Sequence, residues 1–294
     1  MSRLRTSWDI AKRSWAVLKA ERSLAWFPVL SFLGNAAVAG VFGLLIYGVS
    51  GHGDSGSGSG SGFSLGAMSY VFIACWYVAA AFVTTYFMAA LVAGADTALQ
   101  GNDATVSGAM QVANSRLHRI LPWALVTATV SILLRALAST GRLGEIVASL
   151  LARGWDVFTF LVVPILVVED VGPGDAFKRS KQLFGKTWGE NIAGQFGLSV
   201  VAFLAFLPAL LVIGLGVASG TMLLAVPAIA VGVAWLLVVA AVVSALSGIY
   251  RTALYRYATT GAVPPAFEGA DFQGAFKAKK SNGGFGGFSG FSRN

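Results

Sequence analysis

The chain alternates between long apolar runs and short polar segments. Six apolar runs lie near residues 24–49, 63–94, 121–139, 155–169, 192–218 and 221–250. A helix of about 20 apolar residues crosses the hydrocarbon core of a bilayer, and most of these runs reach that length. The pattern therefore predicts an all-α integral membrane protein in which residues 24–258 form one domain, a bundle of six transmembrane helices.

Three of the polar segments have the periodicity of amphipathic helices. Around residues 8–19, 109–120 and 176–188, apolar and polar side chains fall on opposite faces at about 100° per residue. Basic side chains accompany the first and third segments: Lys12, Arg13, Lys178, Arg179 and Lys181. We expect residues 1–23 to form one such helix. Each of the three helices should lie at the cytoplasmic interface with its apolar face toward the lipid.

Two short motifs suggest internal repetition. DIAKRS (9–14) and DAFKRS (175–180) are identical at Asp, Lys, Arg and Ser, and each opens an amphipathic segment followed by two spans. The repeating unit would be one interfacial helix and one helical hairpin, used over residues 1–94, 95–170 and 171–258. The alternative is that any cytoplasmic segment preceding a hairpin tends to have this pattern.

Two segments have the composition of unstructured chain. Residues 51–62, GHGDSGSGSGSG, resemble a flexible coil, and residues 259–294 are polar and rich in glycine. We expect an external loop at the first and a disordered cytoplasmic tail at the second. The first apolar run is longer than the core of a signal peptide, about 7 to 15 residues, which favours an uncleaved span.

The distribution of positive charge predicts the orientation. Of the 21 Lys and Arg residues, 18 lie in segments that are cytoplasmic if the N-terminus is inside, whereas Arg142 and Arg153 lie outside and Arg135 lies within a span. The cytoplasmic side of membrane proteins carries the excess of Lys and Arg. We therefore expect a plasma membrane protein with both termini cytoplasmic. The net charge of +8 points to anionic lipid headgroups as partners rather than to nucleic acid, and homo-oligomerisation is left open.

Two acidic residues stand at the end of the fourth span. Glu169 and Asp170 precede VGPG, whose Gly and Pro predict the end of a helix. Because the helix dipole disfavours carboxylates there, we expect a cation from Lys178, Arg179 or Lys181 to answer them. Neighbouring helical side chains point apart, which does not suit a catalytic pair. Structural anchoring is the favoured interpretation, ahead of a polar gate or binding role and of catalysis.

A second candidate pair lies near the outer ends of two spans. Arg135 is about one turn from the end of the third span, and Asp156 is at the start of the fourth. Arg135 could extend to the headgroups or pair with Asp156, and such a pair facing a cavity would be a sign of transport.

The sequence offers few groups for metal or cofactor chemistry. Its single cysteine, Cys75, lies in an apolar run, and His52 and His118 lie in different polar segments. These residues do not provide a disulfide or the ligand sets of zinc and haem sites. Phosphate-binding and hydrolase motifs are also missing. We therefore expect no cofactor, no metal site and no catalytic residue.

Three motifs together resemble a known family. SWDIAKRSWAVLKAERSLAWFPVLS, VVPILVVEDVGPGDAFKRSKQLFGKTWGENI and IYRTALYRYATTG with FEGADFQGAFKAKK are similar to an uncharacterised family of prokaryotic multispanning membrane proteins, a domain of unknown function. The middle motif is distantly similar to the membrane domain joined to some glycerophosphodiester phosphodiesterases. The resemblance implies a fold and a membrane location. It does not imply phosphodiesterase activity, because the separate catalytic barrel of those enzymes has no counterpart in this chain.

The spans are almost wholly apolar between their ends. A transporter needs a polar, hydrated cavity near the bilayer midplane. We therefore expect a non-enzymatic integral membrane protein with a membrane-organising, partner-binding or envelope role. The alternative is a small-solute transporter or channel, and a lipid-active membrane enzyme ranks third.

Overall fold

The computed structural model describes residues 12–50, 67–262 and 264–267, without the side chains of residues 50, 67, 184–201 and 266. The expected loop at 51–62, the start of the helix expected at 1–23 and the tail from 268 onward lie outside these residues. In the described parts every regular element is helical. After a helix over residues 12–20, the elements are η1 (Arg22–Ala25), α2 (Trp26–Ser50), α3 (Ala67–Leu99), α4 (Val106–Ser115), α5 (Leu117–Ala138), α6 (Arg142–Thr159), α7 (Val162–Val168), α8 (Pro173–Ala218), α9 (Met222–Thr260) and η2 (Pro265–Phe267).

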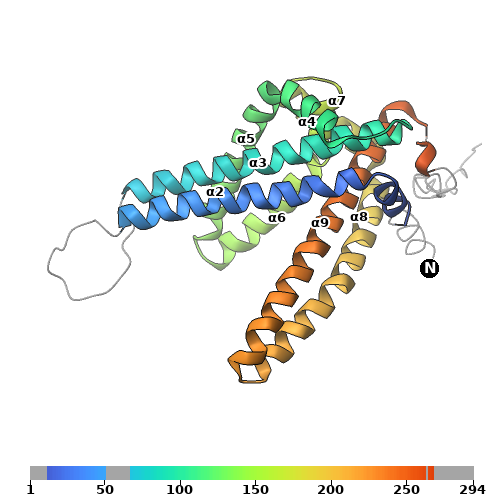
Figure 1. Cartoon of the computed structure of the whole chain (residues 1–294). Helices are drawn as coiled ribbons and strands as arrows, with labels where there is room; N and C mark the ends of the chain where they lie inside the picture. The colour runs from blue at the N-terminus through green and yellow to red at the C-terminus, as the bar shows by residue number, and fades with distance from the viewer. Residues whose placement is uncertain (1–11, 51–66, 263, 268–294) are drawn as a thin grey trace, which may run out of the picture.

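The long helices form three hairpins, α2–α3, α5–α6 and α8–α9 (Figure 1). Their shared end, where α3 and α9 finish and α7 lies, is called the base here, and the connections at 51–66, 139–141 and 219–221 are the tips. Figure 1 shows that the hairpins α2–α3 and α8–α9 diverge from the base. The expected bundle is therefore arranged as hairpins that are joined at one end. In hydrocarbon, apolar helices gain little from contact with each other over contact with lipid, which permits this arrangement.

Five described helical segments are long and apolar enough to cross a membrane: Arg22–Val49, Met68–Leu99, Leu117–Ala138, Arg142–Val168 and Met222–Thr260. A shorter apolar helix covers Ala202–Ala218, within the fifth expected span. These segments agree with a membrane protein.

The fourth expected span, 155–169, differs from the structure in its start and its continuity. The helix begins earlier, at Arg142 after Gly141, whose φ of 119° favours glycine. It is interrupted between α6 and α7, at Phe160 and Leu161. Pro164 explains the interruption, because it cannot donate a hydrogen bond to the carbonyl group of Phe160, four residues earlier, and its ring crowds that carbonyl.

The third interfacial helix, expected around 176–188, is not a separate element. It is continuous with the fifth span in α8, a single helix of 46 residues that starts with Pro173 in its first turn. Pro is well tolerated there, and nothing in the described backbone breaks the helix before Ser219. A helix that runs directly into a span cannot lie flat along the membrane over its whole length.

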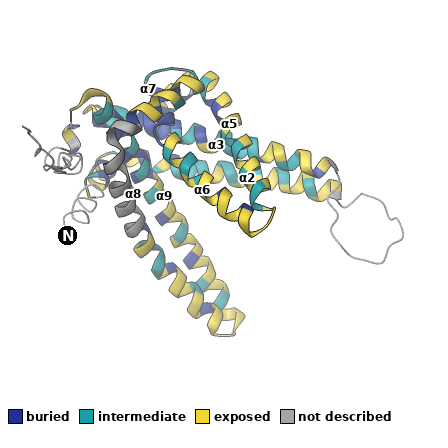
Figure 2. Cartoon of the chain, turned by 180° about the vertical axis from the view of Figure 1, so that it is seen from behind, coloured by how far each residue is buried: buried dark blue, intermediate teal, exposed yellow. Residues whose placement is uncertain are grey.

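The buried core is concentrated at the base. It contains the last third of α3 from Ala89, most of α7 and the part of α9 from Ala245 to Tyr255. Figure 2 shows buried residues gathered there, while the hairpins toward their tips are mostly exposed. Exposed apolar side chains near the tip of α8–α9 include Leu215, Met222 and Leu223, with 73%, 85% and 85% of their surface accessible.

The three amphipathic segments pack their apolar faces on this core. Val17, Ala109 and Leu183 all belong to the same buried cluster. These faces are therefore covered by protein, and the expectation that they point toward lipid does not describe them. Ser14 and Ser180, which occupy the same position in DIAKRS and DAFKRS, are both fully buried. This likeness fits the repeated order of one helix and one hairpin.

Candidate functional site

Glu169 lies in the base, where three helices meet. It follows α7 and is partly buried, its Oε1 accepts a hydrogen bond from the Tyr255 hydroxyl of α9 at 3.0 Å, and Arg179 Nε of α8 lies 3.6 Å from the same oxygen. Arg179 is one of the three cations named from the sequence. The carboxylate thus joins the second hairpin to both helices of the third.

Asp170 is bound by two arginines at the start of α5. It forms an ion pair with Arg116, at the junction of α4 and α5, and its Oδ1 lies 3.5 Å from Arg119 Nε. Its φ of 53° is in the left-handed region that Asp tolerates better than most residues. Arg116 Nε also donates to the Val167 carbonyl group at 3.3 Å. Asp170 therefore ties the start of α5 to the turn between α7 and α8.

A third ion pair in the base was missed from the sequence. Arg256 of α9 donates to both carboxylate oxygens of Asp96 in α3, with 2.9 Å between Nη2 and Oδ2. The two side chains are only 27% and 16% exposed. Bidentate pairing of this kind is among the stronger polar interactions. It connects the first hairpin to the third, so charged groups link all three hairpins at the base.

Arg135, Lys12, Lys178 and Lys181 do not join this network among the described residues. Arg135 is exposed on α5 and forms no ion pair with Asp156 or any other residue that the structure describes. Lys12 and Lys181 are exposed, and Lys178 lies 3.8 Å from Asp175 in a surface pair. Arg13 is partly buried.

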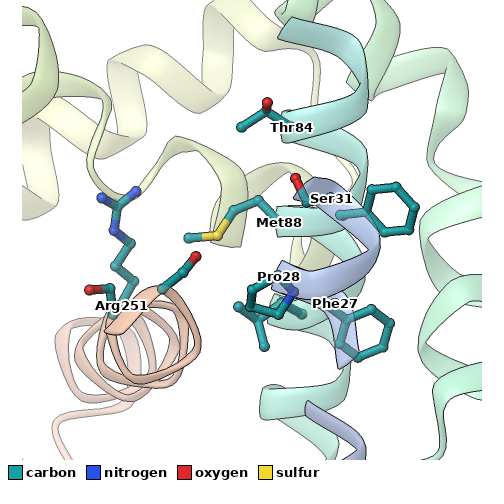
Figure 3. Close-up of a pocket in the computed structure, with 10 residues that line it drawn as sticks. Phe27, Pro28, Ser31, Thr84, Met88 and Arg251 are labelled. Atoms are coloured by element: carbon teal, nitrogen blue, oxygen red, sulfur yellow. The ribbon is translucent and has the colours of Figure 1, made fainter. Parts of the chain in front are cut away.

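Two open cavities meet at Arg251, on the side of the base that faces the tips. The smaller, of about 340 Å³, lies between α9 and the α2–α3 hairpin. Figure 3 shows Arg251 extending from α9 on one side, with Ser31, Thr84 and Met88 on the other. Further hydroxyl groups come from Ser244 and Ser247 of α9. Phe27, Phe87 and Leu91 give the rest of the wall an apolar character.

The larger cavity, of about 470 Å³, lies between α3 and the second hairpin. It shares Thr84, Met88 and Arg251 with the smaller one, so the two are named together the Arg251 chamber. Its wall includes Asp156 and Trp155 of α6. Trp155 is stacked between Trp123 and Phe177, with ring centroids 5.8 and 5.9 Å apart. The aromatic stack fixes the wall where α5, α6 and α8 meet.

The guanidinium group of Arg251 has little to balance its charge. Its Nε is closed to solvent and has no hydrogen-bond partner, and its Cζ lies 4.6 Å above the centre of the Phe160 ring. Among the described side chains none forms an ion pair with it, although Asp156 is near enough to interact electrostatically. Cation–π contact offsets part of the cost of burying a charge, and an anion would offset more.

The groups in the chamber wall are suited to binding a polar or charged ligand. Its described wall has hydroxyl, aromatic and thioether groups with one Arg and one Asp, which suits an anion or a polar headgroup. In the described chain no three His, Cys, Asp or Glu residues are grouped as metal ligands.

Sequence reasoning overlooked Arg251 because it follows directly after the sixth apolar run and was counted with the cytoplasmic cations. The segment IYRTALYRY (249–257) contained a signal that Arg251 lies within the helix and not in a loop. In a helix, Ile249, Thr252, Ala253 and Tyr255 continue an apolar face past Arg251, and all four are buried. An arginine within a continuing apolar helix differs from one in a cytoplasmic loop. Asp96 gave a similar signal, as a lone carboxylate after a long apolar run.

Comparisons with known proteins place the chain in a family without an assigned function. No curated protein and no solved structure matches it. The model of a family of unknown function, DUF6159, matches residues 67–264, which include α3 to α9 and therefore the wall of the chamber apart from α2. The chain belongs to this family of unknown function, DUF6159.

Proposed function

We propose that the protein is a non-enzymatic, six-span integral membrane protein that binds membrane components between its hairpins. Residues 202–218, with the preceding turns of α8, supply the fifth span in chain order and complete the set of six. The base and both termini lie on the cytoplasmic side of the plasma membrane, where the excess of Lys and Arg meets anionic headgroups. This orientation leaves the three tips outside.

One observation carries the proposal: the hairpins pack together only near the base, and the Arg251 chamber opens between them. Side chains that cover the rest of the hairpins are large, apolar and exposed, such as Leu44 on α2 at 74% and Leu223 on α9 at 85%. Exposed apolar surfaces of this extent mark membrane or partner contacts. Lipid or partner helices would fill the spaces between the hairpins, which corresponds to an organising or partner-binding role.

The non-enzymatic part of the proposal follows from the groups in the chamber. An activated nucleophile is typically paired with a base within hydrogen-bond reach. Asp156 is the one carboxylate in the described wall, and its side chain has no hydrogen-bonded partner among the described residues. The likeness to the membrane domain of some glycerophosphodiester phosphodiesterases, and a prokaryotic origin, stay predictions from the sequence motifs.

A small-solute transporter is the second candidate. The specific observation in its favour is that hydroxyl groups, Arg251 and Asp156 gather where the two cavities meet, although the spans were expected to be almost wholly apolar. Polar groups inside a membrane domain commonly mark a substrate path.

Uptake into proteoliposomes distinguishes the two candidates. The purified full chain is reconstituted and offered radiolabelled anions, amino acids and sugars, beside Arg251→Gln and the control Arg135→Gln. The organising role predicts the same background flux for all three proteins. Solute flux that is present in the wild type, retained in Arg135→Gln and lost in Arg251→Gln would replace the proposal with transport.

A further inference from the structure

Arg251 is a partly buried cation that forms no ion pair with the residues that the structure describes. The other arginines of the base are paired differently: Arg116, Arg179 and Arg256 each have a carboxylate partner. Arg251 has the Phe160 ring beneath it and an Nε without a partner. Its Nε is closed to solvent, and a cation withdrawn from water without an anion is costly, so an anionic ligand in the adjoining chamber would be favourable.

Asp156 does not supply the missing anion. It lines the larger cavity and interacts with Arg251 electrostatically, yet the two side chains form no ion pair. Asp156 is exposed, whereas the Nε of Arg251 is closed to solvent. The remaining N–H groups of Arg251 are therefore available to a ligand.

The shape of the chamber indicates what kind of ligand would reach Arg251. Cavities of about 340 and 470 Å³ are within the range of ligand sites, roughly 300 to 1,000 Å³. Ser244 and Ser247 lie on the same helix as Arg251, about two turns and one turn before it. The opposite wall has Phe87, Met88 and Leu91. Polar groups are thus near the cation, and an apolar wall continues from it.

The position of Arg251 along α9 also favours an anionic headgroup as the ligand. Arg251 follows directly after a run of apolar residues in α9. About one turn later begin the polar contacts of the base, the hydrogen bond of Tyr255 and the ion pair of Arg256. In the proposed orientation this position is at the level of the cytoplasmic headgroups. Guanidinium groups bind phosphate and carboxylate oxygens in pairs.

We propose that the Arg251 chamber binds an anionic amphiphile, with its phosphate or carboxylate head on Arg251 and its hydrocarbon chain in the space between the α2–α3 and α8–α9 hairpins. The head accepts hydrogen bonds from the guanidinium group and from the serine hydroxyls of α9. The chain lies against Phe87 and Leu91 and continues into the lipid. This inference rests on the proposed function, because it requires the hairpins to stand in a bilayer.

The test measures lipid binding to the full chain by native mass spectrometry and by thermal shift in detergent. The probes are phosphatidylglycerol, phosphatidylcholine and inorganic phosphate, which separate an anionic amphiphile, a neutral one and the free anion. We expect phosphatidylglycerol to bind and to raise the melting temperature, with little effect of the other two. Arg251→Gln should weaken its binding by about tenfold or more, as expected for a lost charged hydrogen bond, whereas Arg135→Gln should bind as the wild type does.

Three results would overturn the inference: equal binding of phosphatidylglycerol and phosphatidylcholine, wild-type binding by Arg251→Gln, or inorganic phosphate that binds as tightly as the lipid. If Arg251→Gln does not fold, Ser247→Leu provides a second variant, because it keeps the cation and fills the smaller cavity. It should also lose phosphatidylglycerol binding, and retained binding would contradict the proposed position of the lipid.

Flotation of the wild type with phosphatidylcholine vesicles is measured first. A chain that does not float refutes the proposed function, whereas one that floats without preferring phosphatidylglycerol refutes this inference alone.

Discussion

Replacement of Gly216 by alanine tests how closely α8 and α9 approach each other. Gly216 is buried in the α8–α9 hairpin, and a Cβ atom there would overlap the Ala228 Cβ of α9 and lie 3.4 Å from the Leu224 carbonyl oxygen. Because carbon atoms in contact stay about 3.5 to 4.0 Å apart, the helices would have to separate by roughly an ångström. The Ala228 Cβ is fixed to the backbone and cannot rotate away. Such overpacking costs about 1 to 3 kcal/mol.

Gly214→Ala is the matched control, two residues away on the same helix. A Cβ at Gly214 meets nothing within 4 Å, so this variant gains only the helix preference of alanine over glycine, about 1 kcal/mol. The same gain is present in Gly216→Ala, and the difference between the two variants therefore isolates the clash. We expect Gly216→Ala to be less stable than Gly214→Ala by about 1 to 3 kcal/mol.

The free energy of unfolding is measured by SDS titration in mixed micelles, with the fluorescence of the eight tryptophans as signal. A compensating Ala228→Gly change should restore more than half of the loss in Gly216→Ala, since it removes the other Cβ of the clash. Equal stability of Gly216→Ala and Gly214→Ala would refute the close approach of the two helices.

Three further substitutions test the base and the chamber wall. Asp96→Ala leaves its guanidinium partner on α9 unpaired and should lower the free energy of unfolding by about 2 to 4 kcal/mol in the same titration. The exposed control Asp175→Ala should lower it by less than about 0.5 kcal/mol. Similar losses in both variants would contradict a structural role of the Asp96–Arg256 ion pair. Tyr255→Phe removes the hydroxyl donor to Glu169 and should cost about 1 to 2 kcal/mol, with an unchanged stability speaking against that bond. Trp155→Ala removes both aromatic stacks and should lower the free energy of unfolding by at least about 1 kcal/mol beyond the loss of buried area, and near-ultraviolet circular dichroism should report the lost ring packing.

Local pattern was sufficient to predict the helical class and the approximate positions of most long helices. The apolar runs predict the positions of α2, α3, α5 and α9, because the length and hydrophobicity of a run can be read from the sequence without knowing which residues pack together. The end of a helix before VGPG also follows from local chemistry, and the structure has α7 ending at Val168 and α8 beginning at Pro173. Helix ends were less predictable where buried packing extends a helix past its apolar run, as for α9, which continues to Thr260.

The spread of the hairpins and the composition of the site could not be read from the sequence. Asp96 and Arg256 are 160 residues apart, and their pairing depends on how α3 and α9 cross at the base. The position of Arg251 between two cavities likewise depends on three hairpins at once. By contrast, Glu169 drew attention because a carboxylate at a helix end is unfavourable by itself, a signal that single-sequence reasoning can detect.

The central claim is that three hairpins extend from one base to the same side of a membrane. Single cysteines at Ser139 and Ser219 in two tips and at Thr260 in the base, all exposed, are introduced into a Cys75→Ala chain. A membrane-impermeant maleimide is then applied to cells before and after permeabilisation. We expect the two tip positions to react in intact cells and Thr260 to react only after permeabilisation. Reaction of Thr260 together with either tip in intact cells would contradict the account.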